Sequence, residues 1–164
     1  MDFLLLAVVV LAAFAIAKSA RIVPSSQAWI VERLGRYRRT LHPGFHLTLP
    51  LFDRVAFRHS LELQQRRAVH DLTTAEERTV PVAIEWSFRV LDERRASYEV
   101  ADLETFVERL LEAAAKRSVE KRPESDLREA TREIEADVQR EAAPQLETVG
   151  VALVDVSIAA HRRE

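Results

Sequence analysis

Hydrophobic and polar residues are unevenly distributed along the chain, and its first segment is entirely apolar. Residues 3–17 are fifteen consecutive apolar side chains, and Lys18 and Arg21 follow them. A helix of that length measures about 22 Å, less than the roughly 30 Å hydrocarbon core of a bilayer. Continuing it through Ile22 and Val23, with both basic side chains reaching toward headgroups, gives a tolerable span. We predict a membrane anchor over residues 1–23, formed by Phe3, Leu4, Leu5, Leu6, Val8, Val9, Val10, Leu11, Phe14 and Ile16.

Two other interpretations of this segment stay open. A secretory signal peptide has a basic start, an apolar middle and a cleavage site of small residues. The stretch AIAKSA resembles such a site, but the chain starts with Met1 and Asp2, so its start is acidic. A buried core helix is disfavoured because no polar face interrupts the apolar run.

Strand-like segments follow Pro24, which cannot continue a helix and marks the start of the folded part. Residues 28–35 and 54–65 have strand character, and a turn at 43–44 separates them. The clearest strand is residues 78–90, where apolar residues occupy every second position: Val80, Val82, Ile84, Trp86, Phe88 and Val90. This spacing predicts a half-buried antiparallel sheet. Pro81 is expected at a sheet edge or at the start of its strand.

The apolar spacing changes to a helical period in the second half of the chain. It predicts one helix over residues 102–121, capped at its start by Asp102. A second helix is predicted to begin near Ser125, and Pro144 should bend or end it. These two helices give the domain the apolar faces that a sheet needs for packing.

A last strand completes the predicted fold. Gly150 closes the helical segment, and residues 151–160 return to strand character. Strands followed by helices and a final strand predict an α+β domain with an antiparallel sheet and packed helices. We place this domain at residues 24–160 and a C-terminal tail at 161–164.

Composition excludes several classes of function. The chain has 164 residues, 48% hydrophobic and 30% charged, with a net charge of −2. This balance shows neither the basic excess typical of nucleic-acid binding nor the charge dominance of a disordered chain. There is no cysteine, which excludes a disulfide framework, a thiolate zinc site and a cysteine nucleophile.

The five histidines do not predict a metal site. His42 and His46 have a spacing that places two ligands on one helical face, but the Pro43-Gly44 dipeptide between them prevents that helix. His59 is expected to pack in the core. The other two, His70 and His161, have no companion ligands in the sequence.

No catalytic motif is present either. The sequence contains no HExxH, no glycine-rich phosphate loop and no GxSxG element. A hydrolase needs a nucleophile beside a base, and no recognisable motif surrounds Ser60, Ser87 or Ser97. We therefore predict no catalytic residue, no metal and no cofactor.

A cluster of arginines shortly after the anchor has two interpretations, contact with lipid and a solvent-exposed surface that serves solubility, and the sequence favours neither strongly. Basic residues near anionic headgroups contribute about 1 kcal/mol each. An apolar segment, PGFHLTLPLF, follows this cluster and has the character of a bilayer-facing loop, although a buried strand explains it equally well. The predicted lipid-contacting residues are Arg33, Arg36, Arg38, Arg39, Phe45, Leu47, Leu49, Leu51 and Phe52.

An ordered series of short segments carries a family resemblance. The segments are IVPSSQAWIVERLGRYRRT, LPLFDRV, AIEWSFRVLDERRASYEV and VGVALVDVSI, and together they cover nearly the whole chain. In this order they resemble the SPFH or band 7 domain of stomatins, prohibitins and flotillins. The similarity is greatest to the bacterial stomatin-like, or paraslipin, branch.

The resemblance implies a membrane-bound scaffold without catalytic activity. Its copies associate laterally into homo-oligomers, organise membrane microdomains and regulate partners such as membrane proteases or an NfeD-type membrane protein. The positive charge on the C-terminal side of the anchor places the domain on the cytoplasmic face of the cell membrane. Two alternatives from other classes are an exported soluble binding domain with a cleaved signal peptide and a membrane-anchored hydrolase.

Overall fold

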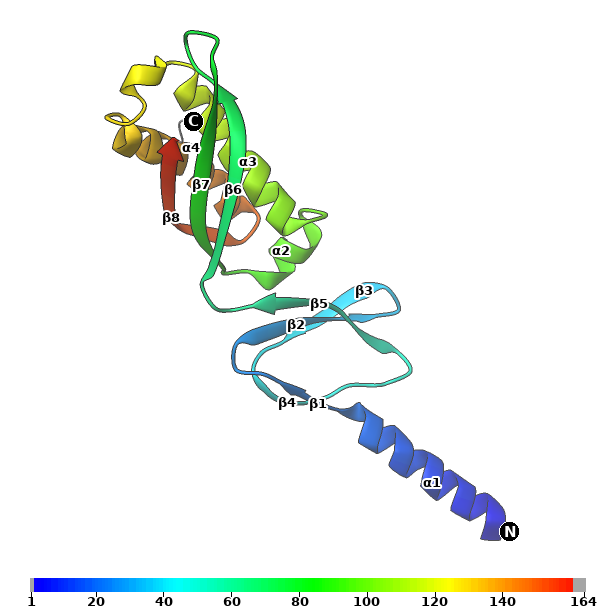
Figure 1. The fold of residues 1–164 in the computed structure, drawn as a ribbon. Helices are drawn as coiled ribbons and strands as arrows, with labels where there is room; N and C mark the ends of the chain where they lie inside the picture. The colour runs from blue at the N-terminus through cyan, green and yellow to red at the C-terminus, as the bar shows by residue number, and fades with distance from the viewer. Residues whose placement is uncertain (1, 161–164) are drawn as a thin grey trace. The chain divides into compact units, whose positions relative to one another are not determined.

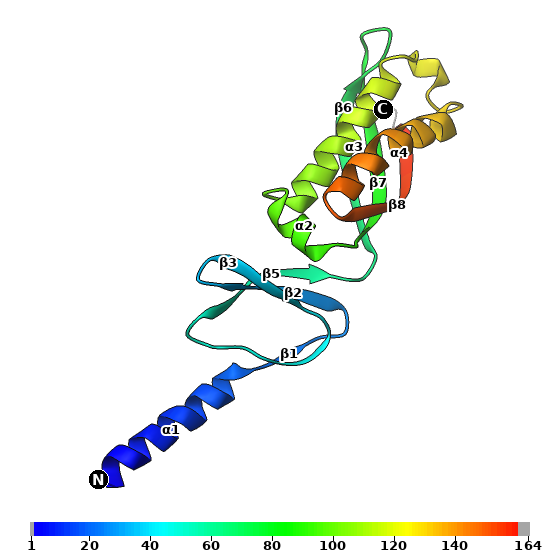
Figure 2. The ribbon, with the colours of Figure 1, turned by 180° about the vertical axis from the view of Figure 1, so that it is seen from behind.

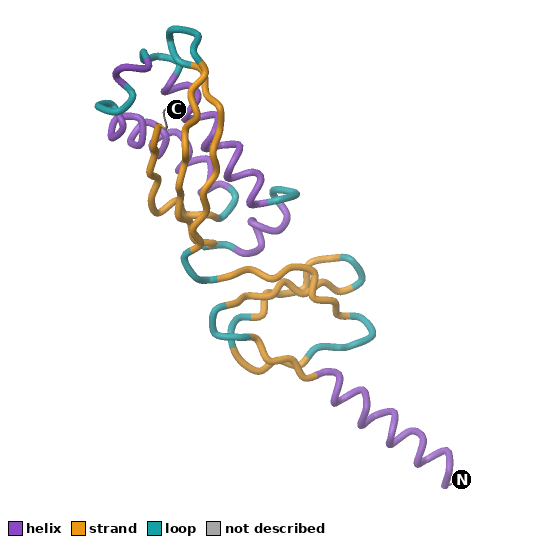
Figure 3. The backbone as a smooth tube through the Cα atoms, in the orientation of Figure 1, coloured by secondary structure: helices purple, strands orange, loops and turns teal. Residues whose placement is uncertain are grey.

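The computed structural model of the chain describes residues 2–160, and Figures 1 and 2 show its ribbon from two opposite sides. The predicted C-terminal tail at 161–164 and Met1 lie outside the described residues. The chain divides into two compact units, residues 1–61 and residues 62–164. Figure 3 shows that strands make up most of the first unit after its single helix, whereas the second combines a sheet with helices.

The first unit contains two small antiparallel sheets. Its elements are α1 (Asp2–Ser19), β1 (Ala20–Val23), β2 (Gln27–Arg33), β3 (Arg36–Leu41), β4 (Gly44–Leu47) and β5 (Asp53–Ser60). Strand β1 pairs with β4, and the second sheet has the order β3-β2-β5. The core of this unit is the buried cluster Val23, Val31 and Leu41, with Trp29 and Val55 packed against it.

The predicted extension of the first helix through Ile22 and Val23 is wrong. Helix α1 ends at Ser19, and the next four residues form β1. Both residues are β-branched and therefore suit a strand. Val23 is only 3% exposed because it packs in the core of the unit, while Ile22 lies opposite Phe45 of β4.

A tight hairpin joins β2 to β3. Its two loop residues, Leu34 and Gly35, both have positive φ angles, of +52° and +78°. Two consecutive positive φ values are the signature of a type I′ turn, whose twist matches that of the flanking strands. Glycine adopts this conformation freely, whereas a leucine side chain makes it costly.

The second unit packs helices against one face of a three-stranded antiparallel sheet of order β6-β7-β8 (Figures 1 and 2). Its elements are β6 (Gln64–Thr73), β7 (Thr79–Val90), α2 (Glu93–Tyr98), α3 (Leu103–Val119), a short 3₁₀ turn (Glu124–Asp126), α4 (Thr131–Thr148) and β8 (Val151–Ala160). The six apolar residues predicted to share one face of β7 are all buried. Five of them, all except Val90, belong to one core cluster with apolar side chains of the two long helices, including Val107, Leu111, Ile134, Val138 and Leu146.

Pro81 lies near the start of β7, as predicted, but β7 is the central strand of the sheet, so the alternative of an edge strand is wrong. Proline lacks the N–H that a central strand normally donates. The register explains why it is tolerated: Pro81 lies opposite Asp71 of β6, while pairing with β8 begins one residue later, at Val82.

The predicted helices are present with altered boundaries. Asp102 caps α3 by accepting hydrogen bonds from the backbone N–H groups of Glu104 and Thr105, as predicted. Helix α4 begins at Thr131 and not near Ser125, because the chain first makes a 3₁₀ turn and buries Leu127. Pro144 does not end α4, which continues to Thr148 through the fully buried Leu146.

Strand β8 pairs with β7 on one side only and is therefore an edge strand. Edge strands expose unpaired backbone groups to other chains. Here the backbone N–H of Ile158 donates a hydrogen bond of 2.9 Å to the carboxylate of Glu135 on α4. One donor of this edge is thus satisfied within the unit.

Candidate functional site

The described side chains of α1 form an uncovered apolar surface. Its exposed members, all predicted as anchor residues, are Phe3, Leu5, Leu6, Val8, Val9, Val10, Leu11 and Phe14. The side chains of the other two, Leu4 and Ile16, lie outside the described part of the structure. Apolar residues occupy every side of the helix, so no polar stripe marks a face for water. Within the part of the chain that the structure describes, no helix combines the length and apolar character required to cross a bilayer.

A second set of uncovered apolar side chains lies on β4 and in the loop that follows it. All five predicted lipid-contacting apolar residues are exposed: Phe45, Leu47, Leu49, Leu51 and Phe52. Leu51 is the most exposed of them, at 88%. They belong to β4 and to the segment between β4 and β5, so they lie in the same unit as α1. Contiguous exposed apolar residues mark surfaces for protein or membrane contact.

Two further residues extend this surface: Ile22, which was predicted as part of the anchor, and Leu34, which was not among the predicted lipid-contacting residues. Ile22 is exposed and lies opposite Phe45 in the β1–β4 ladder. Leu34 is 79% exposed at the tip of the β2–β3 hairpin, and its backbone N–H donates to the carbonyl of Phe52. The hairpin tip and the apolar loop therefore lie side by side. The usual sequence signals for such a tip are Asn-Gly, Asp-Gly and Gly-Gly, and the Leu34-Gly35 pair carries only the glycine.

The four predicted arginines do not all have the same surroundings. Arg36, Arg38 and Arg39 are exposed on β3. Arg33 of β2 is paired with Asp53 of β5, its Nε lying 2.7 Å from one carboxylate oxygen and its Nη2 3.2 Å from the other.

The Arg33–Asp53 pair is bidentate and well satisfied. The side chain of Asp53 is only 2% exposed, and it also accepts the backbone N–H of Leu49 at 2.9 Å. The Arg33 guanidinium, followed by this backbone donor, holds the pKa of the Asp53 carboxyl below its usual range despite the opposing effect of burial. The pair thereby fastens the apolar loop to the sheet.

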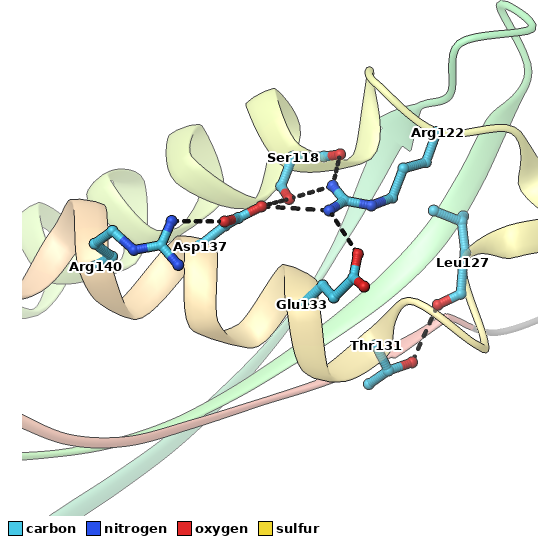
Figure 4. A network of polar contacts seen from close by, with 7 residues as sticks. All are labelled: Ser118, Arg122, Leu127, Thr131, Glu133, Asp137 and Arg140. Carbon is cyan, nitrogen blue, oxygen red and sulfur yellow. Dashed lines mark hydrogen bonds and ion pairs between the residues drawn. The ribbon is translucent and has the colours of Figure 1, made fainter.

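Polar clusters of the second unit provide a test for catalysis. Figure 4 shows the main one, where α3 meets α4: the hydroxyl of Ser118 donates to Asp137 at 3.0 Å and accepts from Arg122 at 2.7 Å. Hydrogen bonds from Ser118, Arg140 and Arg122 hold the pKa of Asp137 below its usual range. A carboxylate with a lowered pKa is a weak base, so the cluster is unsuited to activating a nucleophile. Its bonds instead fasten the two helices together.

The three serines considered as possible hydrolase nucleophiles lie on three different elements, α2, β7 and β5. The hydroxyl of Ser97 donates to the carbonyl of Glu93 at 2.7 Å, within its own helix. Ser87 lies on β7, opposite Asp155 of β8. Ser60 ends β5 and pairs with Gln27.

The histidines likewise fail to converge. His46 Nε2 lies 2.7 Å from the backbone carbonyl of His42, which links the pair without forming a ligand set. His70 lies on β6 between Glu108 and Glu112 of α3, 3.5 Å from each. Among the described residues, no group of three or more histidine or carboxylate side chains is arranged to hold a metal ion. His161 lies outside them.

Comparison with known proteins places this arrangement in a family. The model of the SPFH domain / Band 7 family matches residues 21–162. The chain belongs to this family. The match begins in β1, after the end of α1, so the SPFH domain includes strands of the first compact unit and both strands and helices of the second. The resemblance drawn from the sequence segments is confirmed.

Several curated relatives of this SPFH domain share about a third of their aligned residues with it. Stomatin-like protein 2, mitochondrial, from Homo sapiens is 35% identical over 89 residues, 54% of this chain and 25% of that protein. Stomatin-like protein stl-1 from Caenorhabditis elegans is 32% identical over 104 residues, 60% of this chain and 31% of that protein. An uncharacterized protein from Mycobacterium tuberculosis is 31% identical over 105 residues, 62% of this chain and 27% of that protein. The matched region thus spans about a quarter to a third of the length of these relatives.

Proposed function

We propose that this chain is a membrane-attached scaffold of the SPFH family that assembles laterally and performs no catalytic step. The observation that carries the proposal is the uncovered apolar surface of α1, continued by the exposed residues of the loop after β4. Water-exposed apolar surface of this extent is unfavourable, and a lipid bilayer removes it from water.

The energetics favour stable attachment. Transfer of one Val, Leu or Phe side chain out of water yields about 1.5–3 kcal/mol. The eight exposed anchor residues of α1 together yield about 12–24 kcal/mol before the costs of ordering. A single myristoyl chain binds membranes only marginally, with a constant of about 10⁴ M⁻¹. The helix is therefore a considerably stronger anchor than one acyl chain.

Charge supports an orientation. Lys18 and Arg21 follow the apolar stretch, and the arginines of β2 and β3 lie on the same side of it in the sequence. Positive flanks remain in the cytoplasm, so the domain faces the cytoplasmic side of the cell membrane. Exposed arginines near the anchor then meet anionic headgroups.

Attachment also provides a mechanism for scaffolding. Confinement of copies to a surface raises their effective concentration, so weak contacts between domains suffice for assembly. Charged side chains on α3 and α4 supply register between neighbouring copies. The regulated partners of such an assembly are membrane proteins, of which a protease or an NfeD-type protein is the expected class.

The attachment is tested by vesicle flotation of the full chain. We expect V8D/L11D to leave the vesicle fraction, because two carboxylates in the apolar helix oppose insertion. The matched control is Leu91→Asp, which changes an exposed leucine of the second unit and should float like the unmodified chain. Flotation of V8D/L11D at the unmodified level would contradict the anchoring role of α1.

The scaffold role is tested by the size of the detergent-extracted particle. Imaging after gentle extraction should reveal assemblies of many copies. A particle of a single chain would remove the scaffold mechanism while leaving the fold unaffected.

A further inference from the structure

A cavity of about 360 Å³ opens on the first unit beside the C-terminal end of α1. This volume lies within the range of small-ligand sites. Its lining combines three guanidinium groups and one carboxylate with two leucines, one threonine and the last residue of α1: Arg33, Arg38, Arg39, Asp53, Leu47, Leu49, Thr48 and Ser19. Three positive charges against one negative charge leave the cavity with a net charge of +2.

A β-bulge brings two adjacent arginines to the same cavity. Neighbouring residues of a regular strand point to opposite faces of the sheet. In the β2–β3 ladder, Val31 lies opposite Arg39 and Glu32 lies opposite Tyr37, so Arg38 is an extra residue without a register partner. Such bulges redirect side chains and occur next to functional sites. Both Arg38 and Arg39 line the cavity as a result.

The internal hydrogen bonds do not use up this positive charge. The carboxylate of Asp53 is engaged by Arg33 and by the backbone N–H of Leu49. Arg39 donates to the backbone carbonyl of Leu47, which carries no net charge. Among the described residues, no hydrogen-bond or ion-pair partner of the Arg38 guanidinium is found. Arg38 and Arg39 therefore remain available to an anion.

We propose that this cavity binds the phosphate of an anionic phospholipid headgroup. Arginine binds phosphate through paired, charge-assisted hydrogen bonds. The exposed side chains of Leu47 and Leu49 offer an apolar rim to the lipid's glycerol and proximal acyl carbons. The proposal rests on the attachment of α1 to the bilayer.

The position of the cavity relative to the bilayer follows from its connection to α1. The backbone N–H and the hydroxyl of Thr48 both donate to the carbonyl of Ser19, the last residue of α1, at 2.8 and 3.2 Å. This contact fixes the wall of the cavity to the end of the apolar helix. When α1 lies in hydrocarbon, its polar end lies among headgroups, which is where the cavity opens.

The test compares two single-charge variants of the full chain on vesicles of phosphatidylcholine, with and without phosphatidylglycerol. Arg38→Gln removes the arginine that has no internal partner. Arg36→Gln removes an exposed arginine of the same strand that does not line the cavity. A charge that merely lies near the surface is worth about fivefold in binding. We expect R38Q to weaken binding to anionic vesicles by about twentyfold and R36Q by about fivefold or less, with circular dichroism unchanged in both.

Each outcome separates the headgroup site from the attachment itself. Equal losses of affinity for anionic vesicles in R38Q and R36Q would overturn the site, because the general positive charge of the surface would then explain the binding. Equal binding of the unmodified chain to neutral and anionic vesicles would also overturn it, while leaving attachment by α1 intact. No binding to either vesicle would instead refute the attachment. Calorimetric binding of inorganic phosphate without vesicles, abolished by R38Q, would assign the cavity to a soluble anion and overturn the lipid assignment.

Discussion

Gly150 offers a sharp test of how tightly the second unit is packed. It lies between α4 and β8 with a φ of +78°, and its carbonyl accepts the backbone N–H groups of Leu91 and Asp92. A Cβ at this position would lie 2.6 Å from the carbonyl oxygen of Asp92 and 2.8 Å from its Cβ. The first of these atoms belongs to the backbone before α2, so relief requires the main chain to move.

The loss of unfolding free energy expected for Gly150→Ala has two separable parts. A left-handed conformation costs an L-residue about 1–2 kcal/mol, and overpacking costs a further 1–3 kcal/mol or so. Gly35 has the same φ of +78° but no atom within 4 Å of its hypothetical Cβ. Gly35→Ala therefore carries only the conformational cost. The difference between the two variants, about 1–3 kcal/mol, measures the steric contact alone.

The assay uses the tryptophan that each unit contains. Trp29 lies on β2 of the first unit and Trp86 lies on β7 of the second. Two single-tryptophan variants are therefore used, in each of which the other tryptophan is replaced by phenylalanine. Urea unfolding of each variant in mild detergent is followed by the fluorescence of its remaining tryptophan. Gly150→Ala should lower the midpoint reported by Trp86, and Gly35→Ala should lower that reported by Trp29 by less. Equal losses of unfolding free energy would show that the backbone at Asp92 yields freely and would refute the packing argument.

Two further substitutions probe the helix contact and the hairpin tip. Asp137→Asn should lower the unfolding free energy of the second unit by about 1 kcal/mol at pH 7, because the carboxylate loses charge-assisted hydrogen bonds at a partly exposed site. Folding lowers the pKa of Asp137, so the stability that its carboxylate contributes is present above the unfolded pKa of about 3.9 and disappears as pH falls through the lower folded pKa. The loss of unfolding free energy caused by D137N, measured by urea titration, should therefore shrink from pH 7 to pH 3. A loss that does not depend on pH would contradict this reasoning. Leu34→Gly should stabilise the first unit by about 1 kcal/mol, since it relieves a leucine with a φ of +52°. The same variant should weaken vesicle binding, and unchanged binding would exclude Leu34 from the lipid-facing surface.

The secondary structure of the second unit was easier to predict from the sequence, because its apolar residues recur at regular spacings. The alternation from Val80 to Val90 and the Asp102 cap of α3 are local features, and the structure places both as predicted. The start of α4 was misplaced because burial of Leu127 holds the preceding turn, a tertiary effect that spacing alone does not reveal.

The features of the candidate site were harder to infer because they depend on contacts between distant residues. Arg33 and Asp53 are twenty positions apart, and only strand pairing brings them together. The bulge at Arg38 is a property of the β2–β3 register, which the run of arginines does not specify. The sequence therefore led to a prediction of lipid-contacting residues, but it did not reveal that three of the arginines line one cavity.

The bond from Ile158 to Glu135 limits how copies of this chain meet when they are crowded on a surface. Open-ended fibres grow when the edge strand of one molecule pairs with the edge strand of the next. Pairing of another strand with β8 would first have to break the hydrogen bond between the backbone N–H of Ile158 and the carboxylate of Glu135. For the proposed assembly, this bond disfavours pairing along β8 and favours contacts between folded faces.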